Sequence, residues 1–110
     1  MRLRGRALGC ASVIRNVVLV KLKPDCDRAA VARLQDGFRG LQHSCAGTLS
    51  YTLGEDLGLK DGNWSFAIVA DFTDAEAYKA YDLDAEHNRL RAELAPLAEA
   101  VARVQFDLPG

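Results

Sequence analysis

The chain has 110 residues and a mass of 12.0 kDa, enough for one domain with a modest core and too little for two. Hydrophobic residues make up 49% of it and charged residues 26%, a globular balance, and no apolar run approaches the roughly 20 residues of a membrane helix. Because 14 basic residues stand against 15 acidic ones, no field of one sign is available to attract nucleic acid.

The first residues read as a leader. Arg2, Arg4 and Arg6 give it a basic start, but it lacks the apolar stretch of about 7 to 15 residues that a secretory signal needs. We therefore expect a flexible leader over residues 1–12, a single domain over residues 13–110 and a cytoplasmic location. The three cysteines are widely spaced and form no Cys-x-x-Cys pair, which indicates neither a disulfide framework nor a zinc site.

A β-branched run over residues 13–23 predicts the first strand, ended by Pro24. Alternation places Asn16 on a face that is otherwise aliphatic. The other members of that face are Ile14, Val18, Val20 and Leu22. Because a buried amide costs free energy unless it is paired, we expect Asn16 to meet backbone, water, Tyr81, His87 or a ligand.

The middle of the chain reads as a helix followed by a hairpin. An amphipathic stripe predicts the helix over residues 27–41, with Asp25 or Asp27 as its cap. Strands are expected over residues 48–57 and 63–73, joined by turn-forming residues. One face of the first of these strands carries Leu49, Tyr51 and Leu53. One face of the second carries Trp64, Phe66, Ile68, Ala70 and Phe72.

The remainder reads as two short helices and a strand. Thr73 and Glu76 fit a capping box that opens a helix running to about residue 81. Asp84 is placed to cap the next helix, which Pro96 should kink or end. A short strand over residues 103–108 closes the chain. The sum is a βαββαβ, ferredoxin-like α+β fold with a four-stranded antiparallel sheet and its helices on one face.

The second face of this sheet predicts a homodimer. It is expected to stay apolar and uncovered in a monomer. Its expected members are Val17, Leu19, Leu49, Tyr51 and Leu53. Two such sheets packed face to face around a two-fold axis would bury both faces through an isologous contact.

Tyr81 and His87 form a candidate catalytic pair, because both side chains can move a proton and both lie where one helix ends and the next begins. If Asp84 is the N-cap, His87 is the third residue of its helix. There the positive end of the helix dipole disfavours the imidazolium, so the neutral ring can accept a proton. The alternative is that His87 hydrogen-bonds locally and seals the core, with Tyr81 as a packing residue.

Four more residues are candidates for binding a small molecule between sheet and helices: Asn16, Trp64, Phe66 and Tyr78. Each has an alternative role in the core. The sequence contains no Gly-rich phosphate loop and no nucleophile elbow, and His43 has no second histidine at ligand spacing. We therefore expect no cofactor, no metal, no nucleic acid and no membrane partner.

Four segments resemble the stress-responsive A/B barrel (Dabb) family: residues 14–23, residues 71–77, Tyr81 and Ala85-Glu86-His87. The resemblance covers residues 13–108. It implies a homodimer whose two sheets form a dimeric α+β barrel, in agreement with the open sheet face.

The resemblance also implies roles for the Tyr–His pair. A plant polyketide cyclase of this family uses a tyrosine and a histidine at the same interval in an aldol-type ring closure. By that resemblance His87 would be the general base, and Tyr81 would orient it or polarise a carbonyl. The family commonly carries a histidine where Asn16 stands and a proline where Ala85 stands.

Two functions are therefore predicted. The first is a small homodimeric barrel that binds a hydrophobic or aromatic small molecule and catalyses cofactor-free proton transfer on it, as in polyketide cyclisation. The alternative is a non-catalytic, stress-responsive or structural oligomer-forming protein in which Tyr81 and His87 are structural. A third function, cofactor-free oxygenation of an aromatic substrate, is drawn from the wider dimeric barrel superfamily.

Overall fold

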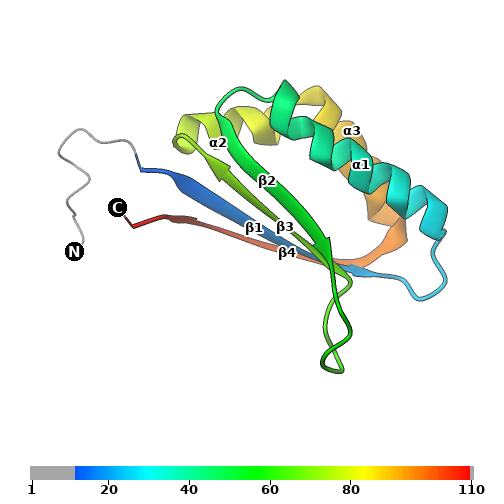
Figure 1. Cartoon of the computed structure of the whole chain (residues 1–110). Coiled ribbons are helices and arrows are strands. Elements are labelled where there is room, and N and C mark those ends of the chain that lie inside the picture. The colour runs from blue at the N-terminus through cyan, green and yellow to red at the C-terminus, as the bar shows by residue number, and fades with distance from the viewer. Residues whose placement is uncertain (1–11, 110) are drawn as a thin grey trace.

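A computed structural model describes residues 12–109. The elements are β1 (Ile14–Leu22), α1 (Arg28–Ser44), β2 (Thr48–Glu55), β3 (Phe66–Phe72), α2 (Ala75–Leu83), α3 (Ala85–Leu94), the 3-10 turn η2 (Ala95–Leu97) and β4 (Ala98–Asp107). The strands form one antiparallel sheet in the order β2-β3-β1-β4, and α1, α2 and α3 lie on the same side of it (Figure 1). This is the predicted ferredoxin-like α+β fold. The leader predicted for residues 1–12 falls outside the described residues except for Ser12.

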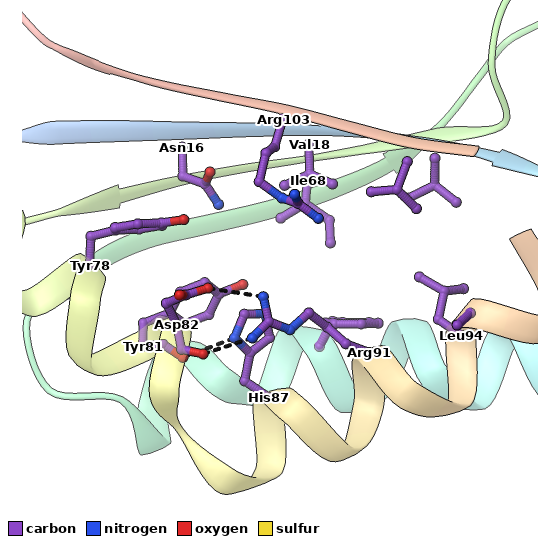
Figure 2. A pocket seen from close by; sticks show the side chains of 14 residues that line it. Asn16, Val18, Ile68, Tyr78, Tyr81, Asp82, His87, Arg91, Leu94 and Arg103 are labelled. Atoms are coloured by element: carbon purple, nitrogen blue, oxygen red, sulfur yellow. Dashed lines mark hydrogen bonds and ion pairs between the residues drawn. The ribbon is translucent and has the colours of Figure 1, made fainter.

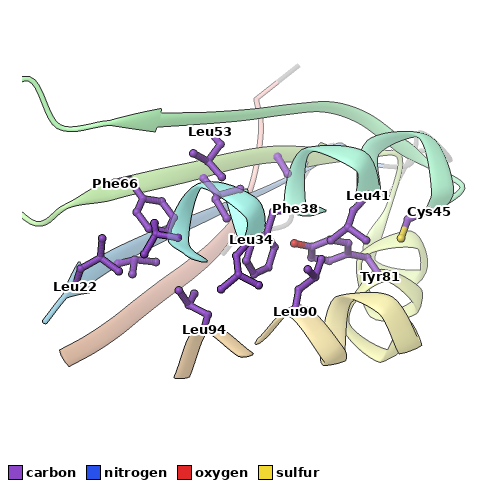
Figure 3. Packing of buried hydrophobic residues seen from close by; sticks show 14 of the residues in the cluster. Leu22, Leu34, Phe38, Leu41, Cys45, Leu53, Phe66, Tyr81, Leu90 and Leu94 are labelled. Carbon is purple, nitrogen blue, oxygen red and sulfur yellow. The ribbon is translucent and has the colours of Figure 1, made fainter. Parts of the chain in front are cut away.

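The core fills the space between the sheet and the helices. One face of β3 and the apolar stripe of α1 supply most of it (Figure 3). Its β3 members are Phe66, Ile68, Ala70 and Phe72, and its α1 members are Val31, Leu34, Phe38 and Leu41. Trp64, expected on the same strand face, precedes the start of β3 at Phe66 and is only half-buried.

Caps fix where the helices begin. Asp27 is the N-cap of α1 and accepts hydrogen bonds from the backbone of Ala29 and Ala30, so of the two expected caps it is the one used. The capping box predicted at Thr73 is wrong. Asp74 caps α2 instead, because its carboxylate accepts from Ala77 N at 2.8 Å, while the N–H of Thr73 donates to the carbonyl of Gly47.

The register of β2 corrects the predicted sheet faces. Thr48 pairs with Phe72, but Ser50 pairs with Asp71, so Leu49 occupies a bulge and is 52% exposed. The bulge reverses the alternation of the later residues of β2, and both Tyr51 and Leu53 point toward the helices. They were expected on the open face and instead pack in or against the core.

The open face is nevertheless apolar, because β4 supplies the hydrophobic side chains that were expected from β2. Val104 pairs with Val17 and Phe106 pairs with Arg15, so both β4 side chains share the face of Leu19. Leu19, Val104 and Phe106 are 43%, 53% and 45% exposed. Strand β4 is also longer than predicted, since it begins at Ala98 directly after the turn around Pro96. No helix among residues 12–109 is both long and apolar enough to cross a membrane.

Candidate functional site

The junction between α2 and α3 builds the centre of the site. Asp84 ends α2 and is the N-cap of α3, and its carboxylate accepts from the backbone N–H of His87 at 2.9 Å. The predicted cap is confirmed, and it makes His87 the third residue of α3. Only 6% of His87 is exposed.

The ring of His87 is held in one orientation by Tyr81. Nδ1 of His87 lies 2.9 Å from the backbone carbonyl oxygen of Tyr81, which can only accept, so Nδ1 carries the proton of the neutral ring. The two rings stack with their centroids 4.0 Å apart. No residue in the described part of the chain hydrogen-bonds to Nε2, which is left as a free acceptor. Burial lowers the pKa of His87, and the Tyr81 carbonyl opposes this change only in part.

The hydroxyl of Tyr81 points elsewhere. It lies 2.9 Å from the hydroxyl of Tyr51 on β2, and burial raises the pKa of Tyr81 to about 12. Tyr81 therefore stays protonated at neutral pH. Its contact with His87 is made through its backbone carbonyl and the face of its ring, and not through its hydroxyl.

A cavity of about 210 Å³ opens beside this pair, between the sheet and the helices (Figure 2). Its apolar walls include Val18, Phe38, Ile68 and Leu94. Its polar lining comprises Asn16, Tyr78, Tyr81, Asp82, His87, Arg91 and Arg103. The sequence-predicted residues Asn16, Tyr78, Tyr81 and His87 are thus brought to one cavity.

Asn16 is 3% exposed and lies on β1 beside β4. Its Oδ1 accepts from Nε2 of Gln105 at 2.7 Å, a partner that sequence reasoning did not consider. The amide nitrogen of Asn16 donates a hydrogen bond to no described residue, and in Figure 2 it points toward the cavity. Asn16 thus offers the cavity a hydrogen-bond donor.

Trp64 and Phe66 are not brought to this cavity. They line a second hollow, of about 600 Å³, beside the β2–β3 connection. Phe66 is otherwise a core residue with 3% exposure. Trp64 misses the cavity because it lies before β3, where the alternation that would have aimed it at the helices no longer applies.

Three charged residues of the lining were missed by sequence reasoning. Arg91 donates to Oδ1 of Asp82 at 2.9 Å and to the carbonyl oxygen of Asp82 at 2.8 Å, which ties the end of α2 to α3. Arg103 reaches the cavity from β4. The helical interval from His87 to Arg91 was a usable signal for the first of these. The face of Arg103 depended on the pairing of β4 with β1, which the sequence does not specify.

Tyr78 contributes a phenol at the cavity wall. Burial raises its pKa, Asp82 adds to this effect, and Arg103 and Arg91 oppose it. Among the described residues, no group of three or more His, Cys, Asp or Glu side chains is arranged to hold a metal ion. The polar groups that line the site are a neutral imidazole, two phenols, an amide, a carboxylate and two guanidinium groups.

Solved structures share this architecture, a ferredoxin-like α+β domain with its helices on one face of the sheet. A dimeric ferredoxin-like protein of unknown function from Thermobifida fusca is 28% identical, with 89% of this chain and 92% of that chain covered and a TM-score of 0.81. A Dabb family protein from Mesorhizobium loti is 19% identical (90% and 99% covered, TM-score 0.73). The hydroxynitrile lyase from Passiflora edulis is 14% identical (89% and 94% covered, TM-score 0.79).

The family model of the stress responsive A/B barrel domain (Dabb) matches residues 14–109. The chain belongs to this family, as the sequence resemblance predicted. No curated protein gives a significant match to it. The dimeric protein from Thermobifida fusca supports homo-oligomerisation of this chain.

Proposed function

We propose that the protein binds a hydrophobic carbonyl compound in the cavity between sheet and helices, and that His87 acts on it as a cofactor-free general base. The observation that carries this proposal is the fixed tautomer of His87. With Nδ1–H donated to the Tyr81 carbonyl, the lone pair of Nε2 is left for a proton from a ligand.

In the proposed step, Nε2 of His87 removes a proton from the carbon next to a carbonyl group. The electron pair of that C–H bond moves into the carbonyl and gives an enolate. The hydroxyl of Tyr78 and the amide nitrogen of Asn16 are two donors in the cavity lining that would stabilise the enolate oxygen. Asp82 and Asp84 both raise the pKa of His87 and would favour the imidazolium that forms.

Ring closure of the polyketide type would complete the reaction. The enolate carbon attacks a second carbonyl of the same molecule and forms a carbon–carbon bond, and the resulting alkoxide takes the proton from the imidazolium. Atoms and electrons balance without any cofactor. The walls of Val18, Ile68 and Leu94 suit the apolar part of such a substrate.

We further propose that the acting unit is a homodimer with sheets apposed. Leu19, Val104 and Phe106 leave an apolar patch on the sheet face opposite the helices, and a second copy would bury it. The cavity lies on the other side of the sheet, so this contact leaves it accessible.

Hydrogen–deuterium exchange of a ketone tests the base. Hexanophenone in D₂O loses its α-protons slowly, and the protein should accelerate this loss, followed by NMR. His87→Gln should reduce the acceleration by roughly 100-fold or more. The chain supplies its own control: His43→Gln removes the other histidine, which is exposed on α1, and should leave the rate unchanged.

The structural alternative makes a different forecast. In that case His87 only seals the core through its stacking on Tyr81 and its bond to the Tyr81 carbonyl. Hexanophenone would then bind without accelerated exchange, and His87→Gln would lower the melting temperature alone. No observation in the structure favours the oxygenase function over these two.

A further inference from the structure

Arg103 places a cation at the wall of the cavity. It lies on β4 opposite Val18 of β1, so its side chain is on the helix side of the sheet. Figure 2 shows it reaching down from β4 toward the cavity, across from Arg91. No described residue forms an ion pair with it.

Four other arginines have a carboxylate partner, whereas the exposed Arg28 and Arg33 of α1 also have none among the described residues. Arg15 is paired with Asp71, Arg39 with Asp36, Arg89 with Glu86 and Glu93, and Arg91 with Asp82. At the cavity, the charge of Asp82 offsets that of Arg91, and the neutral His87 adds none. The lining therefore keeps one uncompensated positive charge, and Arg103 carries it.

We propose that the ligand of this cavity is an anionic compound, an aryl or alkyl carboxylate whose acid group is held by Arg103 while its apolar body lies against Val18, Ile68 and Leu94. This inference rests on the proposed function, because it concerns the same cavity, and it adds the class of ligand. A guanidinium presents paired donors that match the two oxygens of a carboxylate.

The geometry also assigns an orientation. Figure 2 shows the side chain of Arg103 with Asn16 and Tyr78 on one side, Leu94 on the other and His87 across the cavity. A carboxylate held by Arg103 would lie near Asn16 and across from His87, while the apolar body of the ligand extends along Val18, Ile68 and Leu94. Arg103 is thus a specificity-determining residue: it selects which molecules bind and takes no part in the proton transfer to His87.

A matched pair of probes tests the charge alone. 4-Butylbenzoate and 4-butylbenzamide have nearly the same shape and differ in their net charge. Isothermal titration calorimetry should find the benzoate bound roughly tenfold more tightly or better, the size expected for one charge-assisted hydrogen bond. Because the attraction is partly Coulombic, added salt should weaken benzoate binding and leave benzamide binding unchanged.

Variants assign the preference to one residue. Arg103→Gln should reduce the preference for the benzoate to within about twofold, with benzamide affinity unchanged, since the removed group is a charge and not a wall. Arg33→Gln is the control: Arg33 is exposed on α1, away from the cavity, and also lacks an ion-pair partner among the described residues. It should keep the full preference.

The outcomes separate the two proposals. If the intact protein binds both probes equally, or if Arg103→Gln keeps the preference, the anionic ligand is refuted while binding in the cavity stands. If neither probe binds and hexanophenone exchange is not accelerated, the proposed function fails together with the inference. A preference for the benzoate that is lost only in Arg103→Gln establishes the inference.

Discussion

Nδ1 of His87 donates a hydrogen bond to the backbone carbonyl of Tyr81, six residues earlier, at 2.9 Å. The same carbonyl also accepts from the N–H of Asp84 at 3.1 Å. One oxygen at the end of α2 therefore sets both the turn into α3 and the tautomer of the histidine. The turn from α2 into α3 requires the six-residue interval between Tyr81 and His87. The tautomer of His87, and with it the chemistry of the ring, depends on that interval.

The pKa of His87 should lie below its ordinary value of 6.5, because burial disfavours the imidazolium. An NMR titration of the ring protons measures it. Between the folded pKa of His87 and its unfolded value of 6.5, the unfolded chain binds more protons than the folded one. The contribution of His87 to the free energy of unfolding is therefore complete above pH 6.5 and is lost as the pH falls through the folded pKa. His87→Gln should lack this part of the pH dependence in urea unfolding. A folded pKa above 6.5 would contradict the burial argument.

Two neighbours of His87 should shift its pKa in opposite directions. Arg91→Gln removes a positive charge and frees Asp82, so it should raise the pKa of His87. Asp82→Asn removes a negative charge and frees Arg91, so it should lower it. NMR titration of both variants reads this out directly. Shifts of the same sign in the two variants would mean that a structural change, and not charge, controls the ring.

The hydroxyl pair of Tyr51 and Tyr81 should be energetically coupled. Either Tyr51→Phe or Tyr81→Phe leaves a buried hydroxyl without its partner, at a cost of about 1 to 3 kcal/mol in the free energy of unfolding. The double variant removes both groups and should cost clearly less than the sum of the two. Urea unfolding of the four proteins gives the cycle. Strict additivity would show that the hydroxyls do not interact in solution.

Local chemistry explains what could be predicted of this fold. The caps at Asp27 and Asp84, the alternation of β1 and the stripe of α1 depend on residues within a few positions of one another, and the structure agrees with them. Asp74 replaced Thr73 as a cap because the two residues offer the same chemistry one position apart. The sequence pattern alone does not distinguish these two positions of the N-cap.

What could not be predicted depends on pairing between distant residues. The bulge at Leu49 results from how β2 registers with β3, and it reversed the predicted placement of Tyr51 and Leu53. Gln105 as the partner of Asn16, and Arg103 as a cavity residue, both require the register of β4 against β1. A single sequence contains no local signal for that register. The site is therefore predictable around His87 and unpredictable along the β4 edge.

Gly47, between α1 and β2, is expected to resist substitution. Its φ of 84° is in the region that favours glycine, and an added Cβ would lie 2.6 Å from the Cβ of Ala77. Gly58 has a similar φ of 76° with nothing within 4 Å of an added Cβ. Gly58→Ala should therefore cost only backbone strain, about 1 to 2 kcal/mol. Gly47→Ala should cost more in thermal unfolding because of the contact with α2, and equal costs would refute the clash.

The sheet face opposite the helices should hold two copies together. Sedimentation at micromolar concentration should give about twice 12.0 kDa, because an apolar face that includes Leu19, Val104 and Phe106 is unfavourable in water. Phe106→Glu places a charge in this face on each of the two symmetric copies and should dissociate the dimer.

Leu83→Glu is the matched control, because Leu83 is 78% exposed at the end of α2, on the helix side of the sheet, and its substitution should leave the mass unchanged. Dissociation by Leu83→Glu and not by Phe106→Glu would move the interface from the sheet to the helices. In that arrangement the partner would sit beside the cavity and could cover its mouth, so the sedimentation result also decides whether the cavity opens to solvent in the assembled protein.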